Sequence, residues 1–338
     1  MNRIVVCNSS SFGRRFPEHL KRLARLGRVR RVEVGPRVTG AGLARALGPC
    51  RAIVASVAPR YDAAFFRARP EVALIARHGI GVNNVDLEAA TRCGVLVTRV
   101  AGVVEREAMA EHTLALLLSV LRRLNDADWA VRNGRWRDRA SFIGSELQGA
   151  TAGVIGCGNI GSRVVRILAL GFGARVLVCD PFVSAAVIRR AGGAKAPLAA
   201  LLQSASVVTL HCPLTPETRG LIGRHALGRM RRGAILVNTA RGELLDERAV
   251  AAALKAGRLG GLATDVVAAE PAGPRHPFLT CENALVVPHI GAYTGESLRV
   301  MGESVTRAVE STLRGRRPAG LINPQVWRSP ALRIRLRR

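Results

Sequence analysis

The sequence has few lysines, few aromatic residues and no apolar run long enough to cross a bilayer. Only 3 of the 51 basic residues are lysine, and aromatic residues make up 4% of the 338 positions. A membrane-spanning helix needs about 18–20 consecutive apolar residues, whereas the best candidate, residues 114–120, is flanked by Glu111 and Arg122. The first residues, MNRIVVCNSSSFGRR, lack the apolar centre and cleavage site of a signal peptide. We therefore expect a cytoplasmic protein with no membrane partner.

The cysteine pattern suits buried structural residues better than a disulfide framework or a zinc site. The seven cysteines are scattered, odd in number and contain no CxxC pair. Cys157, Cys179 and Cys212 lie within or beside apolar strand patterns. This is typical of small buried residues in a reducing compartment, so the sequence predicts no metal site.

The basic charge is large but not concentrated. The formal net charge is +27, and the arginines are spread along the chain except in the tail RIRLRR, residues 333–338. Such a charge favours non-specific binding of nucleic acid at low salt. No helix-turn-helix, aromatic stacking motif or zinc finger accompanies it, so we expect no dedicated nucleic-acid function. A small anionic substrate or cofactor is the simpler partner.

Apolar, β-branched runs alternate with helical patterns along the chain, which predicts parallel sheets covered on both faces. A chain of 338 residues exceeds the usual limit of about 250–300 residues for one core. Residues 17–27 have helical spacing, and a largely apolar helix is predicted near 105–124. After this second helix the alternation of strands and helices restarts. We expect that long helix to be buried between domains or subunits. The predicted strands are RIVVCN (3–8), RVRRVEV (28–34), AIVAS (52–56), VALIAR (72–77), AGVI (152–155), ARVLVCD (174–180), SVVTLH (206–211), AILVN (234–238), GLATDV (261–266) and ALVVP (284–288).

A glycine loop predicts a dinucleotide site. Gly156, Gly158 and Gly161 form a GxGxxG pattern directly after a predicted strand and at the start of a helix. In this context the glycines permit a tight turn, close approach of pyrophosphate and close packing of helix on strand. Asp180 ends the next strand, where a carboxylate can bind the ribose hydroxyls and repel a 2′-phosphate. The pattern favours NAD over NADP, although Asp180 before Pro181 could also be a helix cap.

Polar residues follow three later strands of the same unit. Thr239-Ala240-Arg241 follows AILVN, Asp265 and Glu270 follow GLAT, and His289 follows ALVVP. Ligands bind outside the carboxyl ends of strands in open α/β sheets, so these side chains can meet in one crevice.

Reduction of a 2-keto acid requires a proton donor and a cation. His289 can supply the proton, Glu270 can orient and charge the ring, and Arg241 can grip the substrate carboxylate. Each residue also has an ordinary structural reading: Arg241 as a surface residue before a helix capped by Asp246, Glu270 as a solvated loop acid, and His289 as a structural residue.

Five motifs resemble the D-isomer-specific 2-hydroxyacid dehydrogenases, a family that includes D-3-phosphoglycerate dehydrogenase. They are GVIGCGNIG, HCPLTPETRGLI (211–222), LVNTARGELLDE (236–247), DVVAAEP (265–271) and VVPHIGA (286–292). The resemblance covers nearly the whole chain. It implies an α/β fold of two Rossmann-like doubly wound parallel-sheet domains, with the NAD domain (103–293) inserted into a substrate-binding domain (1–102 and 294–338).

The resemblance also implies roles for individual residues. It implies a catalytic trio of Arg241, Glu270 and His289, and cofactor contacts at Gly156, Gly158, Asn159, Ile160, Gly161, Asp180, Cys212, Thr239, Ala240, Asp265 and Gly291. RHGIGVNNVD (77–86) is similar to the family's glycine loop, so Ile80 and Gly81, with Arg77 and Arg241, are the expected substrate contacts. AGVVEREAMAEHTLALLL (101–118) is similar to the segment that leads to the interdomain and dimer-forming helix, which implies a homodimer.

Two departures from the family pattern bear on the substrate. Val103-Val104-Glu105-Arg106 stands where the family commonly has an asparagine, and Ala55-Ser56 stands where phosphoglycerate dehydrogenases often have Arg-Ser. Arg60, Arg77 or His78 can replace the lost cation. We expect no additional regulatory domain.

The leading expectation is NAD-dependent oxidation of D-3-phosphoglycerate, as in serine biosynthesis. The alternatives are a glyoxylate or hydroxypyruvate reductase and a non-enzymatic NAD-sensing protein like the family's corepressor members.

Overall fold

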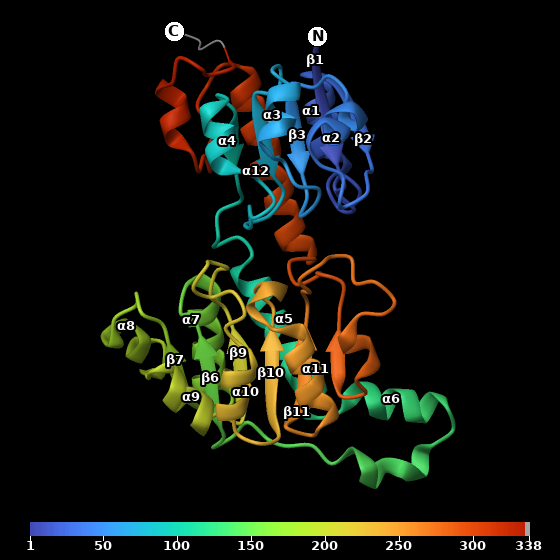
Figure 1. The fold of residues 1–338 in the computed structure, drawn as a ribbon, viewed down its shortest axis with the longest axis vertical. Coiled ribbons are helices and arrows are strands. Elements are labelled where there is room, and N and C mark those ends of the chain that lie inside the picture. Colours follow the sequence, from blue (N-terminus) through green and yellow to red (C-terminus); the bar gives the residue numbers. More distant parts are fainter. Residues whose placement is uncertain (335–338) are drawn as a thin grey trace. The chain divides into compact units, whose positions relative to one another are not determined.

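A computed structural model describes residues 1–334, so Arg335–Arg338 of the predicted basic tail lie outside the described residues. The chain divides into two compact units. Unit 1 consists of Met1–Glu105 and the chain from Tyr293 onward, and unit 2 consists of Arg106–Ala292. Each is an α/β structure built on a parallel sheet (Figure 1), as the sequence pattern predicted.

Unit 1 contains a five-stranded sheet in the order β2-β1-β3-β4-β5. Every pairing is parallel, and both faces carry helices because parallel strands require crossover connections. The strands are β1 (Asn2–Cys7), β2 (Gly27–Val32), β3 (Ala52–Ala55), β4 (Leu74–Arg77) and β5 (Leu96–Thr98). The helices are α1 (Pro17–Ala24), α2 (Gly40–Leu47), α3 (Ala63–Ala68), α4 (Leu87–Arg92), α12 (Gly295–Leu313) and the 3₁₀ turn η5 (Pro324–Arg328).

The C-terminal helix α12 belongs to unit 1, although unit 2 separates it from the rest of that unit in the sequence. Arg22 of α1 forms ion pairs with Glu303 and Glu310 of α12. Asn323 accepts a hydrogen bond from Val97 N at 3.0 Å and donates to Val95 O at 2.9 Å. The last part of the chain therefore packs against the sheet that the first part forms.

Unit 2 contains a seven-stranded sheet in the order β12-β11-β10-β9-β6-β7-β8. The chain starts in the middle at β6, builds outward to β8, and then returns to build the other half from β9. The strands are β6 (Thr151–Ile155), β7 (Arg175–Cys179), β8 (Gly193–Lys195), β9 (Val207–Leu210), β10 (Ala234–Asn238), β11 (Leu259–Thr264) and β12 (Ala284–Val286). The reversal between β6 and β9 is the topological switch point at which such sheets bind ligands.

The helices of unit 2 cover two apolar clusters, one on each face of the sheet. They are α5 (Arg106–Leu121), α6 (Leu124–Arg132), α7 (Asn159–Arg166), α8 (Ala185–Arg190), α9 (Leu198–Ser204), α10 (Arg224–Arg229) and α11 (Glu247–Lys255). Shorter turns are η1 (Trp136–Phe142), η2 (Ile167–Gly171), η3 (Gly242–Leu244) and η4 (Pro277–Thr280). The long apolar helix predicted near 105–124 is α5, which packs on β10, β11 and α7. None of the helices within residues 1–334 is long and apolar enough to cross a bilayer.

Candidate active site

The loop between β6 and α7 has the shape that a pyrophosphate requires. A Cβ at Gly156 would lie 2.6 Å from the backbone nitrogen of Cys212, and one at Gly161 would lie 2.0 Å from the carbonyl oxygen of Gly156. A Cβ at Gly158 would instead meet open space, and Gly158 and Asn159 are exposed at the start of α7. Because the first amides of a helix lack intrahelical acceptors, they attract phosphate. The residues present therefore fit a dinucleotide.

Asp180 follows β7 beside this loop, and backbone amides hold its carboxylate. Oδ2 accepts a hydrogen bond from Cys157 N at 2.7 Å, and Oδ1 accepts from Phe182 N at 2.8 Å and Val183 N at 3.1 Å. Burial, and then the nearby Asp180, raise the pKa of the Cys157 and Cys179 thiols, which keeps both neutral at physiological pH. These hydrogen bonds hold the negatively charged Asp180 carboxylate in place next to the loop between β6 and α7.

The remaining predicted cofactor contacts lie along the strand ends. Ile160 is half-buried in α7, and Cys212 is half-buried after β9, where burial raises the pKa of its thiol to about 11. Thr239 is buried, and its hydroxyl lies 2.9 Å from the hydroxyl of Thr113. Ala240 is half-buried, and its backbone nitrogen donates to Asn238 Oδ1 at 3.1 Å.

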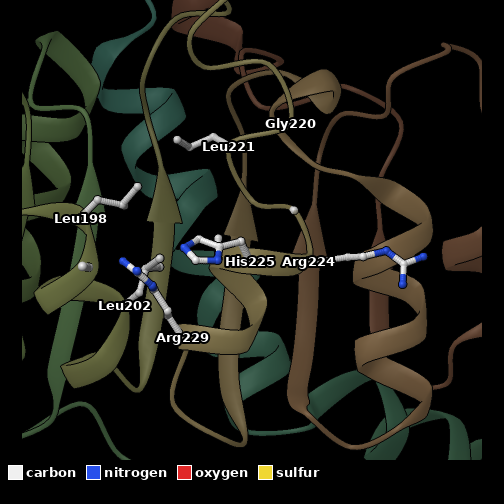
Figure 2. A pocket seen from close by; sticks show the side chains of 10 residues that line it. Leu198, Leu202, Gly220, Leu221, Arg224, His225 and Arg229 are labelled. Atoms are coloured by element: carbon white, nitrogen blue, oxygen red, sulfur yellow. The ribbon is translucent and has the colours of Figure 1, made fainter.

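A pocket of about 290 Å³ lies between α9 and α10, apart from these residues (Figure 2). Leu198, Leu202 and Leu221 line it, and the exposed side chains of His225 and Arg229 lie at its edge. It contains none of the residues that the sequence assigned to cofactor, substrate or catalysis. The candidate active site is therefore elsewhere in unit 2.

His289 and Glu270 form a hydrogen-bonded pair at the carboxyl end of the sheet. Nδ1 of His289 lies 2.8 Å from Oε2 and 3.0 Å from Oε1 of Glu270. Since a carboxylate only accepts, Nδ1 carries a proton, and Nε2 is the ring nitrogen left to exchange a proton with a ligand. The side chains of His289 and Glu270 are 35% and 26% exposed, so a small molecule can reach them.

Arg241 follows the neighbouring strand β10 in a turn that Asn238 organises. The buried Asn238 side chain donates to Arg241 O at 2.8 Å. The half-buried guanidinium of Arg241 donates from Nη1 to Ala240 O at 2.6 Å. Arg241, Glu270 and His289 thus project from the ends of β10, β11 and β12 of one sheet.

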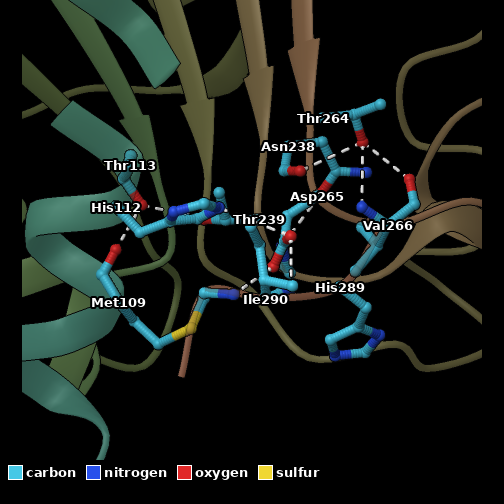
Figure 3. Close-up of polar contacts among 12 residues, drawn as sticks. Met109, His112, Thr113, Asn238, Thr239, Thr264, Asp265, Val266, His289 and Ile290 are labelled. Carbon is cyan, nitrogen blue, oxygen red and sulfur yellow. Dashed lines mark hydrogen bonds and ion pairs between the residues drawn. The ribbon is translucent and has the colours of Figure 1, made fainter. Parts of the chain in front are cut away.

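Asp265 lies directly after β11 and is 1% exposed. Its two carboxylate oxygens accept hydrogen bonds from Ile290 N at 2.7 Å and Gly291 N at 2.9 Å (Figure 3). The sequence assigned Asp265 and Gly291 to the cofactor, and the structure shows that they also bind each other. Sequence analysis did not identify two further polar residues near this turn, Asn238 and His112.

The predicted substrate loop of unit 1 follows β4. Ile80 and Gly81 are partly exposed, whereas Arg77 is 5% exposed and donates to the carbonyl oxygens of Ala55 and His78. Asn84 fixes this loop by donating to Ser56 O at 3.0 Å and Pro59 O at 2.9 Å. These bonds bring the loop close to the segment that carries the exposed Arg60.

Among residues 1–334, no group of three or more histidine, cysteine, aspartate or glutamate side chains is arranged to hold a metal ion.

Comparisons with known proteins find relatives of the NAD-binding unit and of most of the chain. A sequence model of the D-isomer specific 2-hydroxyacid dehydrogenase NAD binding domain matches residues 114–291. A glyoxylate reductase of Korarchaeum cryptofilum is 37% identical over 280 residues, which is 82% of this chain and 84% of that protein. A D-3-phosphoglycerate dehydrogenase of Archaeoglobus fulgidus is 38% identical over 285 residues, 84% of this chain but 53% of that protein. The chain thus spans about half the length of that relative.

Among solved structures, the TT0316 protein of Thermus thermophilus superposes with a TM-score of 0.84 at 36% identity, covering 95% of this chain and 99% of that one.

Proposed function

Because the chain belongs to the D-isomer specific 2-hydroxyacid dehydrogenases, which are NAD-dependent oxidoreductases acting on CH–OH groups, we propose that it interconverts a D-2-hydroxy acid and its 2-keto acid. The observation that carries the proposal is the pairing of His289 with Glu270, with Arg241 following the neighbouring strand β10 of the same sheet.

The proposed mechanism assigns one task to each member of the trio. NADH, when bound, supplies a hydride to C2 of the keto acid. Arg241 binds the substrate carboxylate and polarises the carbonyl group. Protonated His289 donates its Nε2 proton to the carbonyl oxygen, and Glu270 stabilises the imidazolium and orients the ring. In the oxidation direction His289 accepts the hydroxyl proton instead.

We propose that unit 2 is the NAD-binding domain and that unit 1 supplies the substrate contacts. In the first unit, the part-exposed backbone of Ile80 and Gly81 suits binding of a carboxylate by backbone amides. Because water competes with the reacting groups, exclusion of water from the bound substrate would protect the hydride-transfer step.

Our leading substrate is D-3-phosphoglycerate, which would place the protein in serine biosynthesis. Ala55-Ser56 lacks the arginine often present at this point, and Arg60 is the best placed replacement. It is exposed on a segment tied to the substrate loop, whereas Arg77 and His78 are buried. Glyoxylate or hydroxypyruvate is the alternative substrate, which the name of the Korarchaeum relative favours.

We also propose a cytoplasmic homodimer. Large apolar side chains are exposed on α6, on η1 and directly after η1, including Trp129 (58%), Trp136 (69%) and Ile143 (82%). Exposed apolar residues of this size commonly mark a protein interface, and a second copy of the chain is the partner that the family resemblance implies.

The test compares NADH oxidation by the purified protein with 3-phosphohydroxypyruvate, hydroxypyruvate, glyoxylate and pyruvate. We expect turnover that His289→Asn abolishes. Preference for the phosphorylated acid, with a KM that Arg60→Ala raises for that acid alone, would support D-3-phosphoglycerate. Preference for a small keto acid would support the reductase. NADH binding without turnover of any of them would contradict the enzymatic proposal and favour an NAD sensor.

A further inference from the structure

The turn that carries His289 has a backbone conformation that its surroundings must maintain. His289 has φ = 54°, in the left-handed region that costs a non-glycine residue roughly 1–2 kcal/mol. One hydrogen bond inside the turn, from His289 N to Val287 O at 3.1 Å, supports this conformation. Further support has to come from outside the turn, because a histidine does not adopt this conformation by preference.

That support comes from the Asp265 carboxylate, which binds the two residues after His289. Its oxygens accept the amide protons of Ile290 and Gly291 at 2.7 and 2.9 Å, one oxygen to each amide. Both bonds require the carboxylate to keep one orientation. Charge-assisted bonds of this kind are about twice as strong as neutral ones, and a buried carboxylate with too few donors is unfavourable.

Helix α5 packs against the same turn. A Cβ at Gly291 would lie 2.6 Å from the sulfur of Met109, and Nε2 of His112 lies 3.4 Å from Asp265 Oδ1 (Figure 3). The His112 side chain is 17% exposed. Nε2 itself is fully buried and makes no hydrogen bond of good geometry within residues 1–334. The Asp265 carboxylate is the charged group that faces it.

We propose that His112 is a positioning residue for catalysis. Its ring N–H faces the Asp265 carboxylate, keeps it oriented toward Ile290 N and Gly291 N, and so fixes the turn that presents His289. The inference rests on the proposed function, because it takes His289 as the group that transfers the proton. A displacement of about 1 Å in such a group can cost on the order of a hundredfold in rate.

The test uses His112→Phe, which keeps a ring and removes the N–H, and His112→Gln, which restores a donor. For His112→Phe we expect kcat to fall tenfold or more, with KM for the keto acid changed less than threefold. We expect His112→Gln to recover part of kcat. The matched control is His225→Phe on the surface of α10, which should leave kcat unchanged.

A double-mutant cycle separates action through Asp265 from an independent effect. If His112 acts through Asp265, adding His112→Phe to Asp265→Asn causes no further loss of kcat. Additive losses would overturn the proposal, as would an unchanged kcat in folded His112→Phe. A change confined to the dissociation constant of NADH would also overturn it and make His112 a cofactor ligand.

Hydrogen exchange of residues 285–292 in the whole protein provides a readout that does not need turnover. We expect the Ile290 and Gly291 amides to exchange at least tenfold faster in His112→Phe than in the unmodified protein. Unchanged exchange would overturn the inference. A third outcome separates the two proposals. If the amides exchange faster in His112→Phe, while the unmodified protein binds NADH but reduces no keto acid, the positioning of the turn is supported and the proposed function is refuted.

Discussion

Gly291 follows the His289 turn at a position where there is no room for a side chain. Its missing side chain leaves space for the Met109 sulfur and for Asp265 Oδ2, which would lie 2.6 and 2.9 Å from a Cβ. The cofactor contact that the sequence assigned to Gly291 is thus accompanied by a packing requirement. Any side chain there has to displace the Met109 side chain or the Asp265 carboxylate.

We predict that Gly291→Ala lowers activity at least tenfold and lowers the free energy of unfolding by about 1–3 kcal/mol, the usual cost of overpacking. Steady-state kinetics and urea denaturation measure the two effects. Gly228→Ala is the control: a Cβ there, in α10, meets no atom within 4 Å, so we expect a small gain in stability. Full activity of Gly291→Ala would show that the turn tolerates displacement.

Asp180 lies beside the glycine loop, where the sequence predicts that it binds the adenine ribose of NAD. We predict that Asp180→Ala shifts the ratio of kcat/KM for NADPH over NADH toward NADPH by tenfold or more, because the variant no longer repels a 2′-phosphate. Asp180→Asn removes the charge while keeping an oxygen for the backbone amides, so it separates charge from structure. An unchanged ratio in both variants would mean that Asp180 only holds the loop, through Cys157 N and Phe182 N.

At the scale of secondary-structure elements, α11 links the Arg241 turn to the Glu270 loop. Asp246 caps the helix by accepting a hydrogen bond from Ala249 N at 3.0 Å, as the sequence predicted. Glu247 in the first turn accepts from Ala268 N at 2.7 Å, and His276 Nε2 lies 3.2 Å from its other oxygen. The start of this helix therefore supports the segment on which Glu270 lies.

We predict that Asp246→Ala lowers the free energy of unfolding by about 1 kcal/mol, as loss of an N-cap does. Urea denaturation of the whole protein measures the change, and Asp246→Asn, which keeps an acceptor, should lose less. Equal stability of both variants and the unmodified protein would contradict the capping role.

Most strands of the two sheets could be predicted from the sequence because short runs rich in apolar and β-branched residues recur between helical patterns. The strands β5 and β8 were not predicted: β8 has no apolar run, since Gly193 is its only buried residue, and the apolar run at β5 covers only residues 95–97. That Arg241, Glu270 and His289 follow neighbouring strands of one sheet could be predicted because the carboxyl ends of parallel strands share one edge; their catalytic roles stay a prediction. The contact of His112 with Asp265 could not be predicted, since it joins a helix to a strand end 153 residues away in the sequence, and no local spacing encodes it.

At the scale of the whole molecule, stability should depend on pH through a buried histidine of unit 1. Burial lowers the pKa of His78 to about 3, and the neighbouring Arg77 and His19 contribute to the lowering. The folded protein therefore keeps His78 neutral while the unfolded chain binds a proton below its ordinary pKa of 6.5. The stability contributed by the neutral ring is complete above pH 6.5 and is lost as pH falls from 6.5 toward 3.

We predict that His78→Phe reduces the loss of stability between pH 7 and pH 5 by about 2 kcal/mol, since one proton changes the free energy by about 1.4 kcal/mol per pH unit. The substitution keeps a ring against Phe12. Urea denaturation at the two pH values measures it, with His225→Phe as the control for an exposed histidine. The same pH dependence in His78→Phe and the unmodified protein would contradict the prediction.

The division of unit 1 into two stretches of sequence has a consequence for synthesis on the ribosome. Its first 105 residues emerge early, but α12 and Asn323 emerge only after the roughly 190 residues of unit 2, about 10–40 s later at common elongation rates. Unit 2 is continuous in sequence and can fold while the earlier part still lacks its last helix. The nascent N-terminal sheet therefore passes through a period of exposed apolar surface, when chaperones have the most to protect.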